Sequence, residues 1–260
     1  MSLHINSKNI NKMKIGIIGT GMIGSILAKK LSAAGHEVKI TNTRSMPELT
    51  QIAAGLNAEA ATLEEVVQGV EAIIFSIPFN AYQNLPKNLL QNVSQDVTVM
   101  DTSNYYPARD GEISGLQGKT ESEYISETLG RPIIKVFNNI FAYTLENRGK
   151  AAGEEGRIAI SIAGDNEQQK EVAAELVDVL GFDTVDGGTL AESWRQEPGT
   201  PGYCTELNAE QLKQALAEAQ RGKGPVARDF VMDKLQNFQI DPMPPHDEII
   251  ALNRSASAVN

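Results

Sequence analysis

Hydrophobic and polar positions in the first 43 residues follow the pattern of a strand, a helix and a second strand. Lys14–Gly19 (KIGIIG) is apolar on both faces and ends at glycine, which predicts a buried strand. Met22–Ala34 carries apolar residues at helical spacing, and Gly35 marks its end. Glu37–Thr43 then alternates apolar and polar residues, which predicts the second strand.

The alternation of strand and helix patterns continues to about residue 186. Further strands are expected at Ala72–Pro78, Val97–Ser103, Ile133–Phe137, Arg157–Ala163 and Phe182–Val185. Helices are expected at Thr62–Val70, Glu121–Gly130 and Asn166–Leu180, the last with Asp165 as its N-cap. This order predicts an α/β fold with a doubly wound, mostly parallel, Rossmann-like sheet.

The character of the chain changes after about Glu206. Leu207–Gln220 is rich in Ala, Glu and Gln and predicts a helix, which the segment RGKGP at 221–225 interrupts. A short helix is expected at Val231–Phe238. The proline-rich segment 240–248 is expected to be extended, and 254–260 to be frayed.

Three glycines with the spacing G-x-G-x-x-G lie between the first strand and the first helix. In such a turn the first glycine permits tight curvature, the second lets the backbone approach a pyrophosphate, and the third lets the helix pack on the strand. A purely structural turn is the alternative, but the strand–turn–helix–strand context favours dinucleotide binding at the helix N-terminus. The expected contacts are Gly19, Thr20, Gly21, Met22, Ile23 and Gly24.

The end of the second strand indicates which dinucleotide binds. An NAD site usually places a carboxylate there to bind the ribose hydroxyls, whereas this chain has no carboxylate before Glu48. Asn42, Thr43 and Arg44 offer an amide, a hydroxyl and a guanidinium, which can bind a 2′-phosphate. We therefore predict NADP(H); the alternative is that the arginine is only a solvated surface residue.

Two other predicted strands end in small polar residues, and these ends belong to the same edge of a parallel sheet. Ligands of doubly wound sheets bind beyond the carboxyl ends of the strands. The residues expected to border the ribose and nicotinamide are Ser76, Ile77, Pro78, Thr102, Ser103 and Asn104. Pro78 is alternatively only a strand terminator.

Composition excludes several other classes of function. The 260 residues carry a net charge of −10 without a dense Lys/Arg run, so nucleic acid binding is not expected. One cysteine and three scattered histidines predict neither a disulfide nor a metal site. No apolar stretch reaches the roughly 18 residues of a membrane span, and the polar residues 1–12 do not resemble a secretory signal. A cytoplasmic protein is expected.

Four segments in this order resemble the coenzyme F420-dependent NADP oxidoreductase family: KIGIIGTGMIG, TNTR, SIPFNAY and VMDTSN. Four later segments resemble the cytosolic reductase domain of six-transmembrane metalloreductases, which belongs to the same superfamily: KVFNNIFAYTL, IAGD, LGFDTVDGG and TLAESW. The similarity covers roughly Met13–Thr205.

The resemblance implies hydride transfer between NADP(H) and a flavin or deazaflavin (F420-type) ring, with a small-molecule redox acceptor as partner and a homodimer as the assembly. Asn138, Asn139 and Phe141 would then position the acceptor, although an Asn pair at a strand end is also an ordinary turn former. No catalytic residue is identified. Such transfer mainly requires two rings held face to face in a dry cleft.

These observations divide the chain into four parts. A polar tail (1–12) precedes an NADP-binding Rossmann domain (13–140), and a C-terminal α/β extension (141–205) completes the sheet and the substrate-lining acceptor cleft. A helical and extended tail (206–260) follows. Two other functions stay open: an NADP(H)-sensing module without turnover, and an enzyme of the β-hydroxyacid dehydrogenase or pyrroline-carboxylate reductase type, which requires a large all-helical domain.

Overall fold

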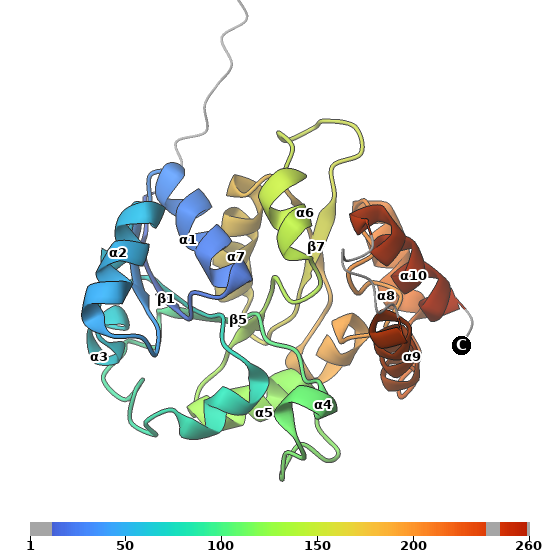
Figure 1. Cartoon of the computed structure of the whole chain (residues 1–260), viewed down its shortest axis with the longest axis horizontal. Coiled ribbons are helices and arrows are strands. Elements are labelled where there is room, and N and C mark those ends of the chain that lie inside the picture. The colour runs from blue at the N-terminus through green and yellow to red at the C-terminus, as the bar shows by residue number, and fades with distance from the viewer. Residues whose placement is uncertain (1–11, 238–244, 259–260) are drawn as a thin grey trace, which may run out of the picture.

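A six-stranded sheet with the order β3-β2-β1-β4-β5-β6 forms the centre of the protein, and all neighbouring strands are parallel. The computed structural model describes residues 12–237 and 245–258, so residues 1–11 of the predicted tail (1–12) lie outside it. The strands are β1 (Lys14–Ile18), β2 (Glu37–Thr41), β3 (Glu59–Ala60), β4 (Ala72–Phe75), β5 (Thr98–Asp101) and β6 (Ile134–Lys135). The predicted Rossmann-like α/β fold is confirmed, and the strand order reverses between β1 and β4. Figure 1 shows helices on opposite sides of these strands.

Helices cover both faces of this sheet, and each face has its own hydrophobic core. Successive residues of a strand point to opposite faces, so Ile74 of β4 packs in one core and Ile73 in the other. On the first face lie α1 (Met22–Ala33), α2 (Met46–Leu56), α6 (Ala142–Asn147) and α7 (Glu167–Val179). On the second face lie α3 (Leu63–Val66), the 3₁₀ helix η1 (Phe79–Asn84) and α5 (Glu121–Leu129).

The two strands of the predicted C-terminal extension do not complete the large sheet. β7 (Ala159–Ile162) and β8 (Asp183–Asp186) pair with each other in a separate parallel sheet. An isolated antiparallel bridge between Lys135 and Ala163 links it to β6. β6 is short because Phe137, at a φ of 60°, turns the backbone out of the sheet two residues after the strand ends.

The N-cap of α7 also differs from the prediction. The side chain of Asn166 accepts a hydrogen bond of 3.1 Å from the backbone N–H of Gln169, so Asn166 caps the helix. Asp165 instead accepts the backbone N–H of Leu190 at 3.1 Å, at the start of the 3₁₀ helix η2 (Leu190–Gln196). This bond connects the end of the second sheet to η2.

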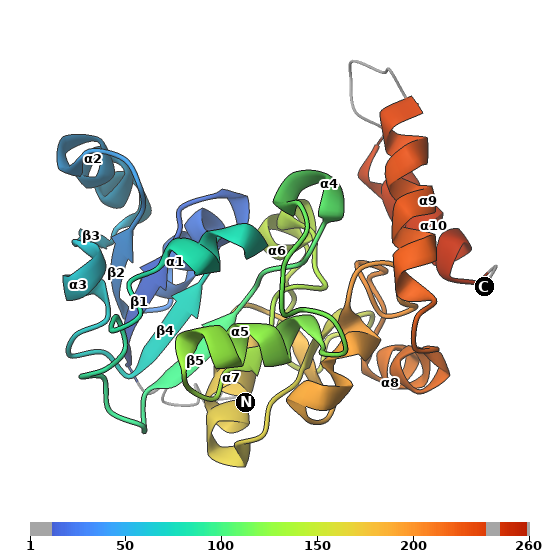
Figure 2. The ribbon, with the colours of Figure 1, turned by 90° about the horizontal axis from the view of Figure 1, so that it is seen from below.

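The tail is more helical than the sequence pattern indicated. It contains α8 (Ala209–Glu218), α9 (Gly224–Asn237) and α10 (His246–Ala258). The predicted break at 221–225 is confirmed, because α8 ends at Glu218 and α9 begins at Gly224. Pro225 lies in the first turn of α9, where a missing N–H breaks no helical hydrogen bond. Of the segment expected to be extended, Pro245 precedes α10 and residues 246–248 begin it, whereas 240–244 lie outside the described residues. Of the segment expected to be frayed, residues 254–258 form the end of α10, and 259–260 lie outside the described residues. In Figure 2, α9 and α10 lie side by side and project away from the large sheet.

Candidate functional site

A cleft of about 330 Å³ lies at the carboxyl ends of β1, β4, β5 and β6. This is the edge at which the strand order reverses, where ligands of doubly wound sheets bind. Of the residues predicted to contact cofactor or acceptor, the lining includes Gly21, Met22, Ile23, Ser76, Ile77, Pro78, Thr102, Ser103, Asn104, Asn138 and Phe141. Residues that the sequence did not single out as site residues complete it: Tyr106, Arg109, Phe137, Ile140, Ala142, Tyr203 and Cys204.

The three glycines of the turn have different surroundings. Gly19 has a φ of +105°, and a Cβ there would lie 2.2 Å from the carbonyl oxygen of Ser76. A Cβ on Gly24 would lie 2.1 Å from the carbonyl oxygen of Gly19, so this glycine permits close packing of helix on turn. A Cβ on Gly21 would meet nothing within 4 Å, because that position faces the open cleft. The space in front of Gly21, which we call the glycine cradle, is therefore open to the cleft.

The N-terminus of α1 points into the same cradle. The helix begins at Met22, and the N-cap Gly21 supplies no side-chain hydrogen bond to its first turn. The first amide groups of a helix have no partner within the helix, and they bind phosphate oxygens readily. The site thus has the donors that the pyrophosphate of a dinucleotide requires.

The predicted 2′-phosphate residues lie beside the glycine turn rather than in the lining of the cleft. Asn42 donates from Nδ2 to Oγ1 of Thr20 over 2.6 Å, and its Oδ1 accepts the backbone N–H of Arg44 at 2.8 Å. The amide of Asn42 thus braces the loop against the turn. The side chains of Thr43 and Arg44 are exposed at the end of β2, the strand whose end faces the adenosine ribose in this fold.

The ends of β5 and β6 are tied together by two asparagines. Asn138 donates from Nδ2 to Oδ1 of Asn104 at 3.0 Å, and Asn104 donates back to the carbonyl oxygen of Asn138 at 2.9 Å. Asn139 does not line this cleft: its Nδ2 lies 3.4 Å from the carbonyl oxygen of Gly202, and its own carbonyl accepts the N–H of Cys204. Asn139 thus supports the 202–204 segment, and its contact with the acceptor stays a prediction.

A buried ion pair supports the turn that follows β5. Lys135 and Asp101 are both fully buried, and their charged atoms lie 2.7 Å apart. Lys135 also donates to the carbonyl oxygen of Ser103, while Asp101 accepts the N–H of Ser103 and the hydroxyl of Tyr82. The backbone N–H and the carbonyl of Ser103 are therefore both hydrogen-bonded to buried side chains, and these bonds hold the Thr102–Asn104 turn in place at the edge of the cleft.

The far wall of the cleft comes from the segment after η2. Cys204 has a φ of 53°, and with Phe137 it is one of two non-glycine residues in the lining that have left-handed backbone conformations. Asn253 of α10 donates to the carbonyl oxygen of Cys204 at 3.2 Å, and Arg254 donates to that of Thr205 at 2.8 Å. The helical tail thus holds part of the wall in place.

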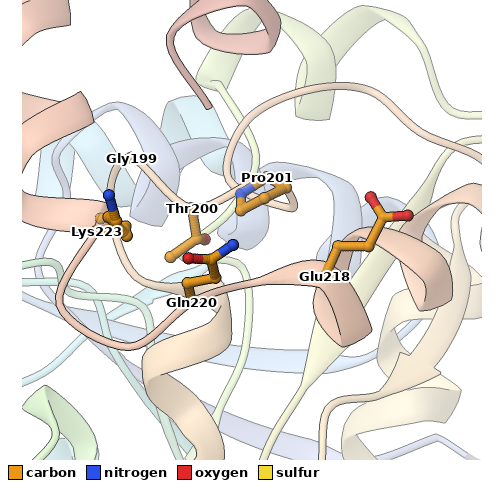
Figure 3. Close-up of a pocket in the computed structure, with 7 residues that line it drawn as sticks. Gly199, Thr200, Pro201, Glu218, Gln220 and Lys223 are labelled. Carbon is orange, nitrogen blue, oxygen red and sulfur yellow. The ribbon is translucent and has the colours of Figure 1, made fainter. Parts of the chain in front are cut away.

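A smaller hollow lies between the 199–201 loop and the junction of α8 and α9 (Figure 3). Thr200, Glu218, Gln220 and Lys223 are among its lining residues. Its volume of about 20 Å³ has room for about one water molecule. It is too small to hold a nucleotide or a ring.

No helix within the described ranges 12–237 and 245–258 is long and apolar enough to cross a membrane.

Comparisons with known proteins agree with this geometry. The sequence model of the family described as NADP oxidoreductase coenzyme F420-dependent matches residues 14–105. Protein YjhV of Escherichia coli (strain K12) is 38% identical over 104 residues, which are 40% of this chain and 74% of that protein. Metalloreductase STEAP3 of Rattus norvegicus is 26% identical over 181 residues, which are 69% of this chain and 35% of that protein.

Solved structures show the same fold. Protein SMa0349 of Sinorhizobium meliloti superposes with a TM-score of 0.62 and 28% identity, covering 76% of this chain and 95% of that one. A candidate F420-dependent NADP-reductase of Arthrobacter sp. FB24 superposes with a TM-score of 0.56 and 23% identity, covering 68% and 86%. The glycine cradle and these similarities lead to one conclusion: the chain belongs to the coenzyme F420-dependent NADP oxidoreductase family and is an NADP-dependent oxidoreductase.

Proposed function

We propose that the protein transfers a hydride from NADPH to a flavin or deazaflavin (F420-type) ring bound in the cleft beyond the Thr102–Asn104 turn. When bound, NADPH supplies the hydride: the C4–H bond of the nicotinamide breaks, and its electron pair forms the new N–H or C–H bond of the acceptor ring. The nicotinamide is thereby oxidised and the acceptor reduced.

The chemistry of the lining carries this proposal. Arg109 is the one charged residue among the described residues that line the cleft, and Asp110 pairs with it at 2.8 Å. The acceptor side otherwise presents uncharged amides, hydroxyls and the ring of Phe141. Such a wall suits the stacking of a planar ring, and direct hydride transfer between rings requires little more than their alignment.

The same lining argues against a dehydrogenase that uses a catalytic lysine. Lys135 is the lysine of β6, yet it lies fully buried beneath Ser103 with its ammonium group on Asp101. It does not line the cleft. We therefore propose the ring reductase and not the β-hydroxyacid dehydrogenase type.

Anaerobic stopped-flow oxidation of NADPH, followed at its absorbance band, tests the proposal with FMN, FAD and a deazaflavin as acceptors. We expect multiple turnovers with at least one of them. NADPH binding without turnover on any of the three would overturn the proposal and favour the sensing module. The assembly proposed with this function is a homodimer, which light scattering would report as twice the mass of the chain.

A further inference from the structure

Two tyrosines that are distant in sequence meet in the acceptor side of the cleft. The hydroxyl oxygens of Tyr106 and Tyr203 lie 2.7 Å apart, and both residues line the cleft. Tyr106 is fixed by its backbone N–H, which donates to Asp110 at 2.9 Å, and by the guanidinium of Arg109, 5.4 Å from its ring centroid. Asn104 holds Tyr203 from the other side, with Nδ2 3.4 Å from its hydroxyl.

The pair has more hydrogen-bond donors than its neighbours use. Two hydroxyls bring two hydrogens, and the bond between them uses one. The amide of Asn104 donates to the hydroxyl oxygen of Tyr203, so this contact does not use the second hydrogen. Tyr203 also makes a side-chain hydrogen bond with Cys204, so its hydrogen is directed towards Cys204 and the oxygen of Tyr106. The hydrogen that remains is that of Tyr106, for which the described residues provide no acceptor other than Tyr203. Burial raises the pKa of both hydroxyls, so both stay protonated at neutral pH.

We propose that the Tyr106–Tyr203 hydroxyl pair is a hydrogen-bond donor for a ring carbonyl of the acceptor, and that it stabilises the negative charge which reduction places there. This inference rests on the proposed function and names the substrate class more narrowly, as hydride acceptors whose reducible ring carries a conjugated carbonyl. Flavins and deazaflavins belong to this class.

The charge balance shows why such a donor matters. Hydride brings an electron pair to the ring, which leaves a negative charge spread over the N1 and carbonyl-oxygen atoms until a solvent proton neutralises it. A donor aimed at that oxygen binds the reduced ring more tightly than the oxidised ring. It therefore lowers the barrier and does not merely tighten substrate binding.

The test uses Tyr106→Phe, Tyr203→Phe and the double variant, with Tyr105→Phe as a matched control. Tyr105 is adjacent in sequence, does not line the cleft, and donates its hydroxyl to the carbonyl oxygen of Gly111 at 2.8 Å. Each variant is assayed for NADPH dissociation constant and for kcat and KM with the flavin or deazaflavin that the wild type reduces best. Methylene blue, whose reducible ring has no carbonyl, serves as a comparison acceptor.

We expect kcat/KM for the carbonyl-bearing ring to fall about 10- to 100-fold in each single variant, mostly in kcat. The double variant should lose little more, because the two hydroxyls act as one unit. NADPH affinity and any methylene blue rate should stay within about twofold. Unchanged kcat/KM in Tyr106→Phe and Tyr203→Phe would overturn the inference, and so would an equal fall in Tyr105→Phe. In either case, turnover by the wild type would still support the proposed function. A wild type that reduces no flavin or deazaflavin overturns both.

Discussion

The amide of Asn42 donates a hydrogen bond to the hydroxyl of Thr20 over 2.6 Å, and this bond joins the end of β2 to the glycine turn after β1. The two halves of the dinucleotide site are thus one connected unit. The sequence pattern singled out Asn42 as a possible 2′-phosphate contact. In the structure its side chain braces the turn, and this brace serves any dinucleotide.

Replacing Asn42 with Ala should weaken NADPH and NADH by similar factors, about 3- to 10-fold, because the turn that holds the shared pyrophosphate loses its brace. Fluorescence titration with each nucleotide measures this. Thr20→Val removes the other partner, and the double variant should bind about as well as the weaker single variant. A loss confined to NADPH would instead make Asn42 a direct phosphate contact.

Arg44 should determine the preference for NADPH over NADH. Its exposed guanidinium stands just past Asn42 at the end of β2, where hydrogen bonds to a charged phosphate are worth about 1.5–3 kcal/mol. Arg44→Ala should therefore raise the dissociation constant of NADPH about 10- to 100-fold and leave that of NADH nearly unchanged. Arg44→Lys keeps the charge but lacks the planar guanidinium fork, so its dissociation constant for NADPH should lie between those of the wild type and Arg44→Ala. Equal losses for both nucleotides would contradict a 2′-phosphate contact.

Gly21 and Gly24 should respond in opposite ways to the same substitution. Gly21→Ala places its methyl group in open space, so the melting temperature should hold while NADPH binding is lost to collision with the pyrophosphate. Gly24→Ala drives a methyl group to within 2.1 Å of the Gly19 carbonyl oxygen, so it should destabilise the fold by about 1–3 kcal/mol. Thermal unfolding with and without NADPH separates the effects. Gly55→Ala, which also meets nothing within 4 Å, is the control that should change neither stability nor binding adversely.

Glu121 should make stability fall as the pH rises. Its side chain is 7% exposed, and burial, with the nearby Glu197, raises the pKa of its carboxyl well above the ordinary 4.5. Lys135 and Asp101 also face it, the lysine with its ammonium group 4.0 Å away. Because the pKa of Glu121 is higher in the folded state than in the unfolded state, its protonated carboxyl stabilises the fold. This stabilisation is complete below pH 4.5 and is lost as the pH rises through the folded-state pKa.

Glu121→Gln puts an uncharged side chain at this position, so the substitution should remove the loss of stability at high pH. We expect the variant to exceed the wild type in unfolding free energy by about 1 kcal/mol or more at pH 8, with a smaller difference at pH 5. Denaturant unfolding at both pH values measures this. Glu127→Gln, at the exposed end of α5, is the surface control and is measured at the same two pH values. An equal shift at pH 5 and pH 8 would mean that the carboxyl of Glu121 does not titrate in this range.

The sequence predicted the parts of the fold that local patterns determine. Strand β1, the glycine turn and α1 are specified by consecutive residues, since apolar runs, glycine spacing and helical periodicity all lie within about 20 positions. The N-cap of α7 was placed one residue early, because Asp165 and Asn166 are both good caps and the contact with Leu190 decides between them. The helix α10 was missed because prolines dominate the segment before it, although Asp247 and Glu248 are typical of a first helical turn.

The acceptor side of the cleft depends on contacts that no local pattern encodes. Tyr106 and Tyr203 are 97 positions apart, and their hydroxyls meet only because the segment after η2 returns to the end of β5. The backbone of Cys204 is left-handed without being glycine, so nothing in its residue type announced the turn. The one available signal was that Tyr106 follows the predicted strand-end residue Asn104 by two positions.

Asn253 should influence the acceptor although it lies outside the cleft. Asn253 is 9% exposed, and its amide donates to the carbonyl oxygen of Cys204, so α10 helps to hold the wall that carries Tyr203. Asn253→Ala leaves that buried carbonyl without its partner and should cost about 1–2 kcal/mol of unfolding free energy. Loosening the wall should lower kcat/KM for the acceptor several-fold, because ring alignment suffers, while the distant glycine turn keeps NADPH affinity unchanged. Ser255→Ala, on the same helix with its hydroxyl on the carbonyl of Leu252, is the matched control and should be silent in both assays. If Asn253→Ala lost stability but kept wild-type acceptor kinetics, α10 would serve the fold alone, and the position of Tyr203 would have to depend on Asn104 and the Gly202–Asn139 contact instead.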